Sequence, residues 1–306
     1  MKHSIRSRLF RRSLGAFVSS PSTPIDDQRI ALERADRLPR PRGVDYADRQ
    51  VGGIDAIVAT PTKVPVERHV LYLHGGGYVI GSPKSHIAMA ARLAIQSHAS
   101  ISVIDYRLAP EHPYPACVDD CVAAYRSVAQ DWDPASIVIA GDSAGGGATL
   151  ATLCALREAG DVLPAAAYLI SPWTDLTASG DSMVTKADVD PMVKPSMLNP
   201  FAEMYAGGLS LDDPGLSPLF ADLSGLPPLL VQAGSDEILL SDSTRLVEAA
   251  RAAGVAVDLD VREGMWHVYQ LFAGMMPEAT TALVEAAAFI RAKTPAQGMP
   301  QLNVVG

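Results

Sequence analysis

The sequence predicts an α/β fold with a mostly parallel central sheet covered by helices on both faces. From about residue 54, short β-branched runs alternate with longer segments rich in Ala and Leu, which is typical of strands alternating with helices. Several of the short runs are almost entirely apolar, as expected when both faces of a sheet are buried. The chain has 306 residues, 48% hydrophobic and 19% charged, so it can bury one large core. We therefore expect a single domain over residues 1–306.

The expected elements follow from these runs and from the turn residues that separate them. Strands are expected at 54–59, 69–73, 101–105, 136–140, 166–171, 229–233 and 255–261. Helices are expected at 85–96, 116–130, 144–159, 240–253 and 278–292.

Two segments interrupt the alternation. Residues 1–45 are helix-like and punctuated by prolines, and residues 178–208 form a long excursion between two strands. Long excursions from a compact α/β domain are commonly lids or binding elements. We therefore expect these two segments to form a helical cap over the ends of the strands.

Charge and cysteine content restrict the class of protein. The net charge of −9 disfavours binding to nucleic acid or to anionic membranes. Residues 1–12 are basic and precede an apolar run at 14–18, which is too short for a secretory signal, so we expect an amphipathic helix lying on the fold. No stretch of the sequence has enough consecutive apolar residues for a stable membrane-spanning helix. The three cysteines, Cys117, Cys121 and Cys154, match no disulfide framework, so we predict a cytoplasmic protein.

The strongest motif is Gly141-Asp142-Ser143-Ala144-Gly145, a G-x-S-x-G sequence between a predicted strand and a predicted helix. Glycines two residues on either side of the serine permit a tight, strained turn that lifts the hydroxyl above the sheet at the start of the helix. This context predicts Ser143 as a nucleophile.

A second motif, His74-Gly75-Gly76-Gly77, follows the strand expected at 69–73. Acyl transfer passes through an oxyanion, and glycines let backbone N–H groups converge on it. We predict that Gly75, Gly76 and Ala144 donate these N–H groups. A phosphate-binding loop is disfavoured because Ile80 stands where G-x-G-x-x-G needs glycine and no G-K-[ST] occurs.

The base and the acid should follow the serine in the order serine, acid, histidine. His267 is the only histidine after Ser143 and is therefore the predicted base. Asp236, directly after the strand expected at 229–233, is the predicted acid. Glu237 remains the local alternative, whereas Asp242 already lies inside the next helix. His86 is interpreted as part of a helix start, and no residue pattern supports a metal site.

With these residues in place, the chain resembles the hormone-sensitive-lipase-like family of bacterial esterases, which has the α/β-hydrolase fold. The resemblance covers most of residues 29–290. Its motifs are HGGG at 74–77, YRLAPEHPYP at 106–115, GDSAGG at 141–146, SPWTDL at 171–176, SDE at 235–237 and MWH at 265–267.

The resemblance implies Asp236 as the acid, an N-terminal helical cap, no cofactor, and short- to medium-chain acyl esters as substrates. It also allows a homodimer, since many members of the family form dimers. The family often has H-G-F at the base, whereas His267 here precedes Val268 and Tyr269.

The predicted reaction is hydrolysis of a carboxylic ester through an acyl-enzyme, with Trp173, Phe201 and Tyr205 shaping the substrate pocket. Lactone hydrolysis, amide or peptide hydrolysis, and O-deacetylation use the same triad, and the fold alone does not choose among them. A non-catalytic small-molecule receptor is the alternative outside the enzymes. The presence of His267 disfavours it.

Overall fold

An eight-stranded sheet forms the centre of the protein, in the order β1-β2-β4-β3-β5-β6-β7-β8. The computed structural model describes residues 11, 14, 23–34 and 38–294. β2 alone runs against its neighbours, and the other strands are parallel to one another. The strands are β1 Val44–Val51, β2 Ile54–Pro61, β3 Arg68–Leu73, β4 Ala99–Ile104, β5 Ile137–Asp142, β6 Ala166–Ile170, β7 Leu229–Gly234 and β8 Val257–Arg262.

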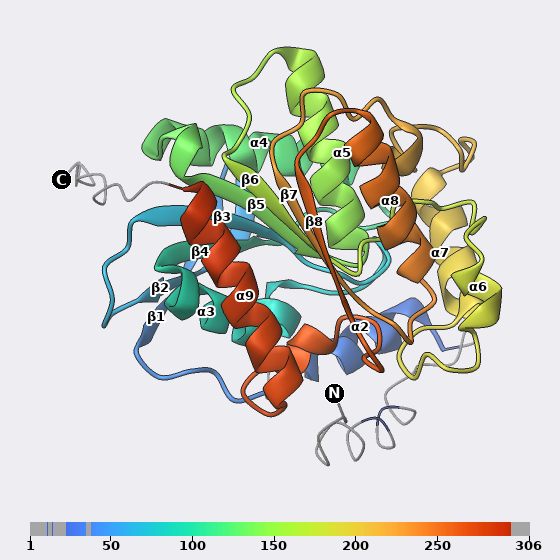
Figure 1. Cartoon of the computed structure of the whole chain (residues 1–306), viewed down its shortest axis with the longest axis horizontal. Coiled ribbons are helices and arrows are strands. Elements are labelled where there is room, and N and C mark those ends of the chain that lie inside the picture. Colours follow the sequence, from blue (N-terminus) through green and yellow to red (C-terminus); the bar gives the residue numbers. More distant parts are fainter. Residues whose placement is uncertain (1–10, 12–13, 15–22, 35–37, 295–306) are drawn as a thin grey trace.

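Helices cover both faces of this sheet (Figure 1). α3 and α9 pack against each other on one face, whereas α4, α5 and α8 cover the other. The helices are α2 Ile25–Glu33, α3 Pro83–Ser97, α4 Ala116–Asp131, α5 Ala144–Ala159, α6 Ser182–Thr185, α7 Pro195–Ala206, α8 Leu240–Ala252 and α9 Pro277–Lys293. Short 3₁₀ turns occupy Pro134–Ser136, Pro218–Phe220 and Tyr269–Phe272.

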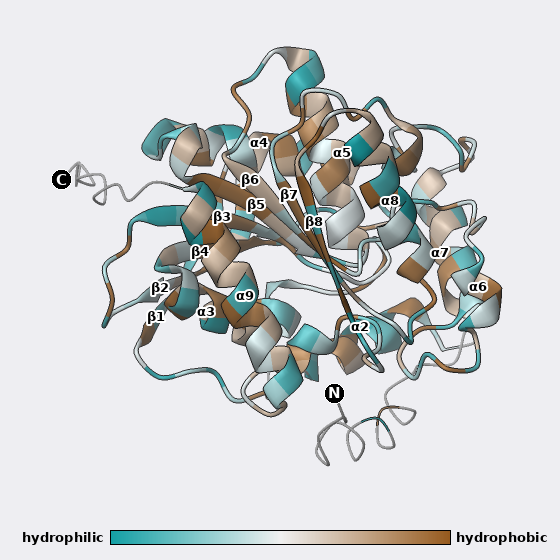
Figure 2. Cartoon of the chain, in the orientation of Figure 1, coloured by the Kyte–Doolittle hydropathy of each residue, from teal (hydrophilic) through white to brown (hydrophobic). Residues whose placement is uncertain are grey.

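The sheet separates two hydrophobic cores. Successive side chains of a strand point to opposite faces, so Leu71 and Leu73 join the core under α4 and α5, while Val70 and Tyr72 join the core under α3 and α9. The central strands are apolar along most of their length (Figure 2). Both faces of these strands are buried, which explains the almost continuous apolar runs of the sequence.

All the expected strands and helices are present, each within two residues of its predicted ends. β1 was not expected. Its inner residues are mostly polar and mostly exposed, and only Val44 and Val51 at its ends are buried. β1 is an edge strand paired with β2 alone, so it carries no long apolar run by which a sequence pattern would identify it.

The predicted cap segments are only partly described. Most of residues 1–22 lies outside the described residues, and so does the expected amphipathic helix there. α2 belongs to the first segment, and α6 and α7 belong to the segment 178–208. Over the described ranges, no helix is both long and apolar enough to cross a bilayer.

Candidate active site

Four neighbouring parallel strands bring the chemical groups together. β5, β6, β7 and β8 end at the same edge of the sheet. Ser143 follows β5, Ser171 follows β6, Glu237 lies just after β7, and His267 lies in the loop after β8. Loops at the carboxyl edge of a parallel sheet are where α/β proteins build their sites.

The turn at Ser143 is strained in the way the motif predicts. Ser143 has φ +52° and ψ −122° and immediately precedes α5, a backbone conformation that non-glycine residues rarely adopt. A Cβ at Gly141 would lie 2.2 Å from the carbonyl oxygen of Gly145, and one at Gly145 would lie 2.0 Å from that of Leu73. Only glycine fits at these two positions, because the backbones of the turn and of β3 approach so closely.

The glycine loop after β3 differs from its predicted role at one residue. The N–H of Gly75 donates to Asp142 Oδ1 at 3.1 Å, so it is not free to bind an oxyanion. Gly76 and Gly77 follow with positive φ of 127° and 63°. Among the described residues, no group accepts a hydrogen bond from the N–H of Gly76, Gly77 or Ala144. The donor set open to a ligand is therefore Gly76, Gly77 and Ala144, with Gly77 in place of Gly75.

Asp142, the residue before Ser143, holds the glycine loop after β3 in place. Its buried carboxylate accepts hydrogen bonds from Gly75 N and from Tyr72 Oη, the latter at 2.7 Å, and lies 3.2 Å from His86 Nε2. Burial raises the pKa of Asp142, but the charge and hydrogen bond of His86 outweigh it, so that the pKa lies below its usual range. His86, interpreted from the sequence only as part of a helix start, thus pairs with the loop anchor.

Of the two adjacent acids, Glu237 and not Asp236 faces the base. Glu237 is fully buried, and its Oε2 accepts hydrogen bonds from Gly234 N at 2.9 Å and from Ser171 Oγ at 2.8 Å. Its Oε1 lies 4.0 Å from His267 Nδ1. Neither of these two buried atoms has a hydrogen-bond partner among the described residues.

Asp236 serves a different contact. Its carboxylate is partly exposed and binds Arg11 at 2.5 Å, with Lys186 Nζ 3.8 Å away. The order of residues along the chain does not distinguish neighbours whose side chains point in different directions. We therefore revise the assignment of the acid from Asp236 to its alternative, Glu237.

His267 is held in a buried loop beside this acid. Burial lowers the pKa of His267, but the nearby carboxylate of Glu237, together with the charges of Asp190 and Asp142, outweighs it and raises the pKa above 6.5. The next residue, Val268, has φ +49°, which is unfavourable for a β-branched residue. Its N–H donates to Ser171 Oγ at 3.1 Å. The family's frequent glycine after the base would avoid this strain.

The three predicted substrate-binding residues lie in different settings. Trp173 is buried, and its backbone N–H donates to the carbonyl of Ser143 at 2.9 Å. The ring of Phe201 lies against the oxyanion loop, since a Cβ at Gly77 would come within 2.4 Å of it. Tyr205 stacks on Tyr78 with ring centroids 3.8 Å apart. Trp173 and Phe201 thus lie beside the serine turn and the glycine loop, whereas the contacts of Tyr205 are those of a core residue.

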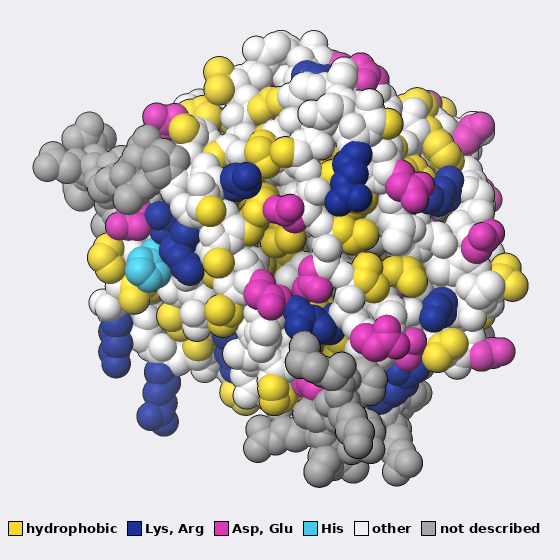
Figure 3. Space-filling view, in the orientation of Figure 1, with side chains coloured by type: hydrophobic (Ala, Val, Ile, Leu, Met, Phe, Trp, Pro, Cys, Tyr) yellow, Lys and Arg dark blue, Asp and Glu magenta, His cyan; other side chains and the backbone are white. Residues whose placement is uncertain are grey.

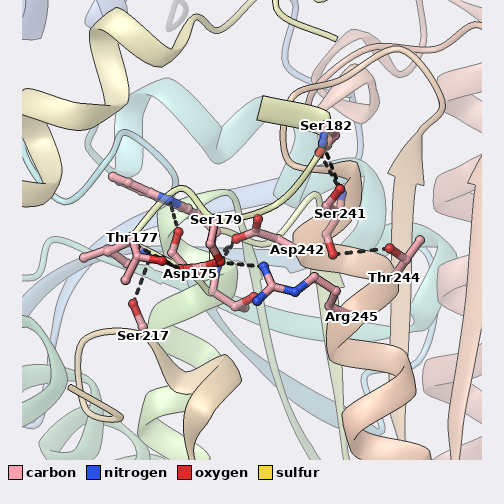
Figure 4. A network of polar contacts seen from close by, with 12 residues as sticks. Asp175, Thr177, Ser179, Ser182, Ser217, Ser241, Asp242, Thr244 and Arg245 are labelled. Atoms are coloured by element: carbon pink, nitrogen blue, oxygen red, sulfur yellow. Dashed lines mark hydrogen bonds and ion pairs between the residues drawn. The ribbon is translucent and has the colours of Figure 1, made fainter. Parts of the chain in front are cut away.

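A polar network supports the segment that follows Trp173 (Figure 4). Asp175 accepts hydrogen bonds from Thr177 and Ser179 and pairs with Arg245 at 2.7 Å. Asp242 Oδ2 accepts from Thr174 N and Asp175 N at 2.9 Å each. Burial raises the pKa of Asp242 to about 7. Asp242 lies inside α8, as the sequence predicts. Its hydrogen bonds hold the backbone at Thr174 and Asp175.

On the face of the surface shown in Figure 3, no large area carries charges of one sign only. Acidic and basic side chains are interspersed among hydrophobic ones there (Figure 3). Within the described ranges, no group of three or more His, Cys, Asp or Glu side chains is arranged to hold a metal ion.

Comparison with known proteins agrees with this architecture. A family model described as the alpha/beta hydrolase fold matches residues 70–271. An acetyl-hydrolase of Streptomyces hygroscopicus is 40% identical over 272 residues, covering 88% of this chain and 91% of the relative. An esterase of Acinetobacter venetianus is 38% identical over 222 residues, covering 72% and 73%.

Solved structures are similar over almost the whole chain. The crystal structure of an esterase from the bacterial hormone-sensitive lipase family has a TM-score of 0.92 and 40% sequence identity, and the match covers 96% of this chain and 100% of that one. The structure of EstE5 soaked with p-nitrophenyl butyrate has a TM-score of 0.90 and 39% identity, with 95% and 99% covered. The chain belongs to the alpha/beta hydrolase fold family, and within it to the group of bacterial hormone-sensitive-lipase-type esterases.

Proposed function

We propose that this protein hydrolyses carboxylic esters with Ser143 as nucleophile, His267 as base and Glu237 as the acid that orients the base. The observation that carries the proposal is the strained turn at Ser143, at the end of β5. The neighbouring strand β6 is followed by Ser171, whose hydroxyl is hydrogen-bonded both to Glu237 and to the N–H of Val268, next to His267. A serine hydroxyl becomes a useful nucleophile only when a held base accepts its proton.

In the proposed mechanism, Ser143 attacks the ester carbonyl while His267 accepts its proton. The N–H groups of Gly76, Gly77 and Ala144 stabilise the oxyanion, where each donor contributes about 3 kcal/mol. His267 then protonates the departing alcohol, and a water molecule, deprotonated by the same residue, releases the acid. The 4.0 Å gap between Glu237 Oε1 and His267 Nδ1 is expected to close as the imidazolium forms, since catalytic hydrogen bonds are often long without substrate.

We infer esters of short- to medium-chain acids as the substrate class. The name acetyl-hydrolase of one relative and the p-nitrophenyl butyrate soaked into a similar esterase support short acyl groups. Lactone hydrolysis and O-deacetylation by the same residues are the alternatives. We further propose that residues 1–45 and 178–208 cap the site. Support comes from Arg29 of α2, which donates to Val79 O next to the glycine loop at 2.9 Å. The cytoplasmic location and the homodimer remain predictions.

The test uses the wild-type protein, Ser143→Ala and the exposed-site control Ser196→Ala. p-Nitrophenyl acetate, butyrate, octanoate and a small lactone panel are the substrates. We expect turnover by the wild type and by S196A, with a loss of about 10⁴-fold or more in S143A. A fluorophosphonate probe should label the wild type and not S143A. Near-normal turnover by S143A would exclude the proposed nucleophile.

A further inference from the structure

Asp190 is a second buried carboxylate at this edge of the sheet, supplied by the 178–208 segment. Its side chain is fully buried, and a buried charge needs several hydrogen bonds to be tolerated. Asp190 Oδ1 accepts from the N–H groups of Met192 at 2.8 Å and Val193 at 3.3 Å. These two bonds close a local turn and use only one of the two carboxylate oxygens.

The other oxygen reaches the acid loop. Asp190 Oδ2 accepts a hydrogen bond of 3.0 Å from the N–H of Ile238, the residue directly after Glu237. α8 begins only at Leu240, so this N–H has no place in a helical hydrogen-bond ladder and would otherwise be buried without a partner. The bond therefore fixes the peptide that carries Glu237 to a residue 48 positions earlier in the chain.

Glu237 is thus held at two places. Gly234 N and Ser171 Oγ donate hydrogen bonds to its Oε2, and Asp190 accepts a hydrogen bond from the N–H of the next residue, Ile238. Oε1 is left facing His267 Nδ1. We propose that Asp190 is a positioning residue through which the 178–208 segment holds Glu237 against His267. This inference rests on the proposed function, because it assigns Asp190 a role toward the proposed acid and base.

The negative charge of Asp190 also favours the protonated form of His267. Three acidic groups act electrostatically on His267: Glu237 from the loop after β7, Asp190 from the 178–208 segment and Asp142 from the end of β5. All three raise its pKa, against the opposing effect of burial. Removing the charge of Asp190 should therefore lower the pKa of His267, and the acid limb of the pH profile should move to lower pH.

The test compares Asp190→Asn with Asp188→Asn. Asp188 is exposed two residues away in the same segment, so D188N makes the same charge change without the contact. An amide at position 190 has one acceptor oxygen and cannot serve both the turn and Ile238. In D190N we expect kcat to fall by about 10- to 100-fold, as for a misplaced catalytic group, with KM within about threefold of the wild type. The acid limb of kcat/KM should move to lower pH, and D188N should match the wild type.

A folded D190N with wild-type kcat and pH profile would overturn the proposal, and so would a variant that changes only the unfolding temperature. The His267 pKa, followed by NMR of the imidazole in labelled protein, should also decrease in D190N. This readout needs no turnover. If the wild type lacked esterase activity, an unchanged His267 pKa would still contradict the role of Asp190, and a lowered one would support it.

A measurement on the wild type covers the case in which D190N does not fold. In amide hydrogen exchange, the Ile238 N–H should be protected and should open together with Met192 N–H, because one carboxylate holds both. Rapid exchange at Ile238 beside a protected Met192 would contradict the link.

Discussion

The hydroxyl of Ser171 donates a 2.8 Å hydrogen bond to Glu237 Oε2. Ser171 Oγ in turn accepts a hydrogen bond from the N–H of Val268, the residue after His267. One side chain at the end of β6 thus joins the loops of the proposed acid and base, and it turns the carboxylate of Glu237 inward. The carboxylate of Asp236 instead pairs with Arg11 and Lys186 near the surface.

Substitution of the two adjacent acids should therefore have unequal effects. Glu237→Gln should lower kcat by about 10³-fold or more, because a neutral amide cannot stabilise the imidazolium. Asp236→Asn should change kcat by less than about fivefold and stability by about 1 kcal/mol or less, since partly exposed ion pairs contribute little. Steady-state kinetics and urea unfolding of both variants provide the measurement. The reverse ranking would restore Asp236 as the acid.

Activity should depend on pH through His267. The base works only when neutral, so kcat/KM should fall as the pH decreases through the His267 pKa, which the acidic neighbours hold above 6.5. Because the folded-state pKa is raised, the pairing also stabilises the fold most below about pH 6.5 and less as the pH rises through that pKa. Profiles of kcat/KM from pH 5 to 9, corrected with S143A, test this. A limb that does not move to lower pH in E237Q would contradict the assignment.

Gly145→Ala should disable the site through the backbone. The new methyl group would lie 2.0 Å from Leu73 O and 2.6 Å from His74 O, so the glycine loop would have to shift. We expect a loss of about 100-fold or more in kcat. Gly160→Ala, at the residue that follows α5 and has nothing within 4 Å of its Cβ, should cost about 1–2 kcal/mol of stability for its left-handed conformation and leave kcat unchanged. Equal activity of the two variants would refute the steric argument.

Asp242→Asn should change stability in a pH-dependent way. Burial raises the pKa of Asp242 to about 7, whereas an unfolded aspartate titrates near 4. A raised folded-state pKa gives a stabilising contribution that is complete below about pH 4 and is lost as the pH rises through about 7. D242N should therefore gain stability relative to the wild type between pH 5 and 8. Urea unfolding across this range, with exposed Asp181→Asn as the control, measures it. A constant difference would contradict the prediction.

The sequence predicted those parts of the molecule that depend on one local pattern. The apolar strands and the helices were located because burial on both sheet faces leaves continuous runs, as in β3 and β5. Ser143 was found because glycine spacing is a direct steric requirement of the turn. His267 was found by its order after Ser143.

The remaining features depend on contacts between distant segments. The direction of Glu237 is set by Ser171, 66 residues earlier, and the N–H of Gly75 is taken by Asp142, 67 residues later. Asp190 reaches Ile238 across 48 residues. β1 lacks an apolar run because it lies at the edge. None of these relationships leaves a trace in the spacing of neighbouring residues.

Both the backbone N–H and the backbone carbonyl of Ser143 form hydrogen bonds that do not involve its side chain. Its N–H donates to Ile170 O at 2.8 Å, and its carbonyl accepts from Gly146, Gly147 and Trp173. Removing the hydroxyl should therefore leave the turn and the proposed oxyanion-binding amides in position. S143A should act as a substrate-trapping form that retains an intact ester, so the natural ligand of the protein could be captured from a metabolite extract and identified by mass.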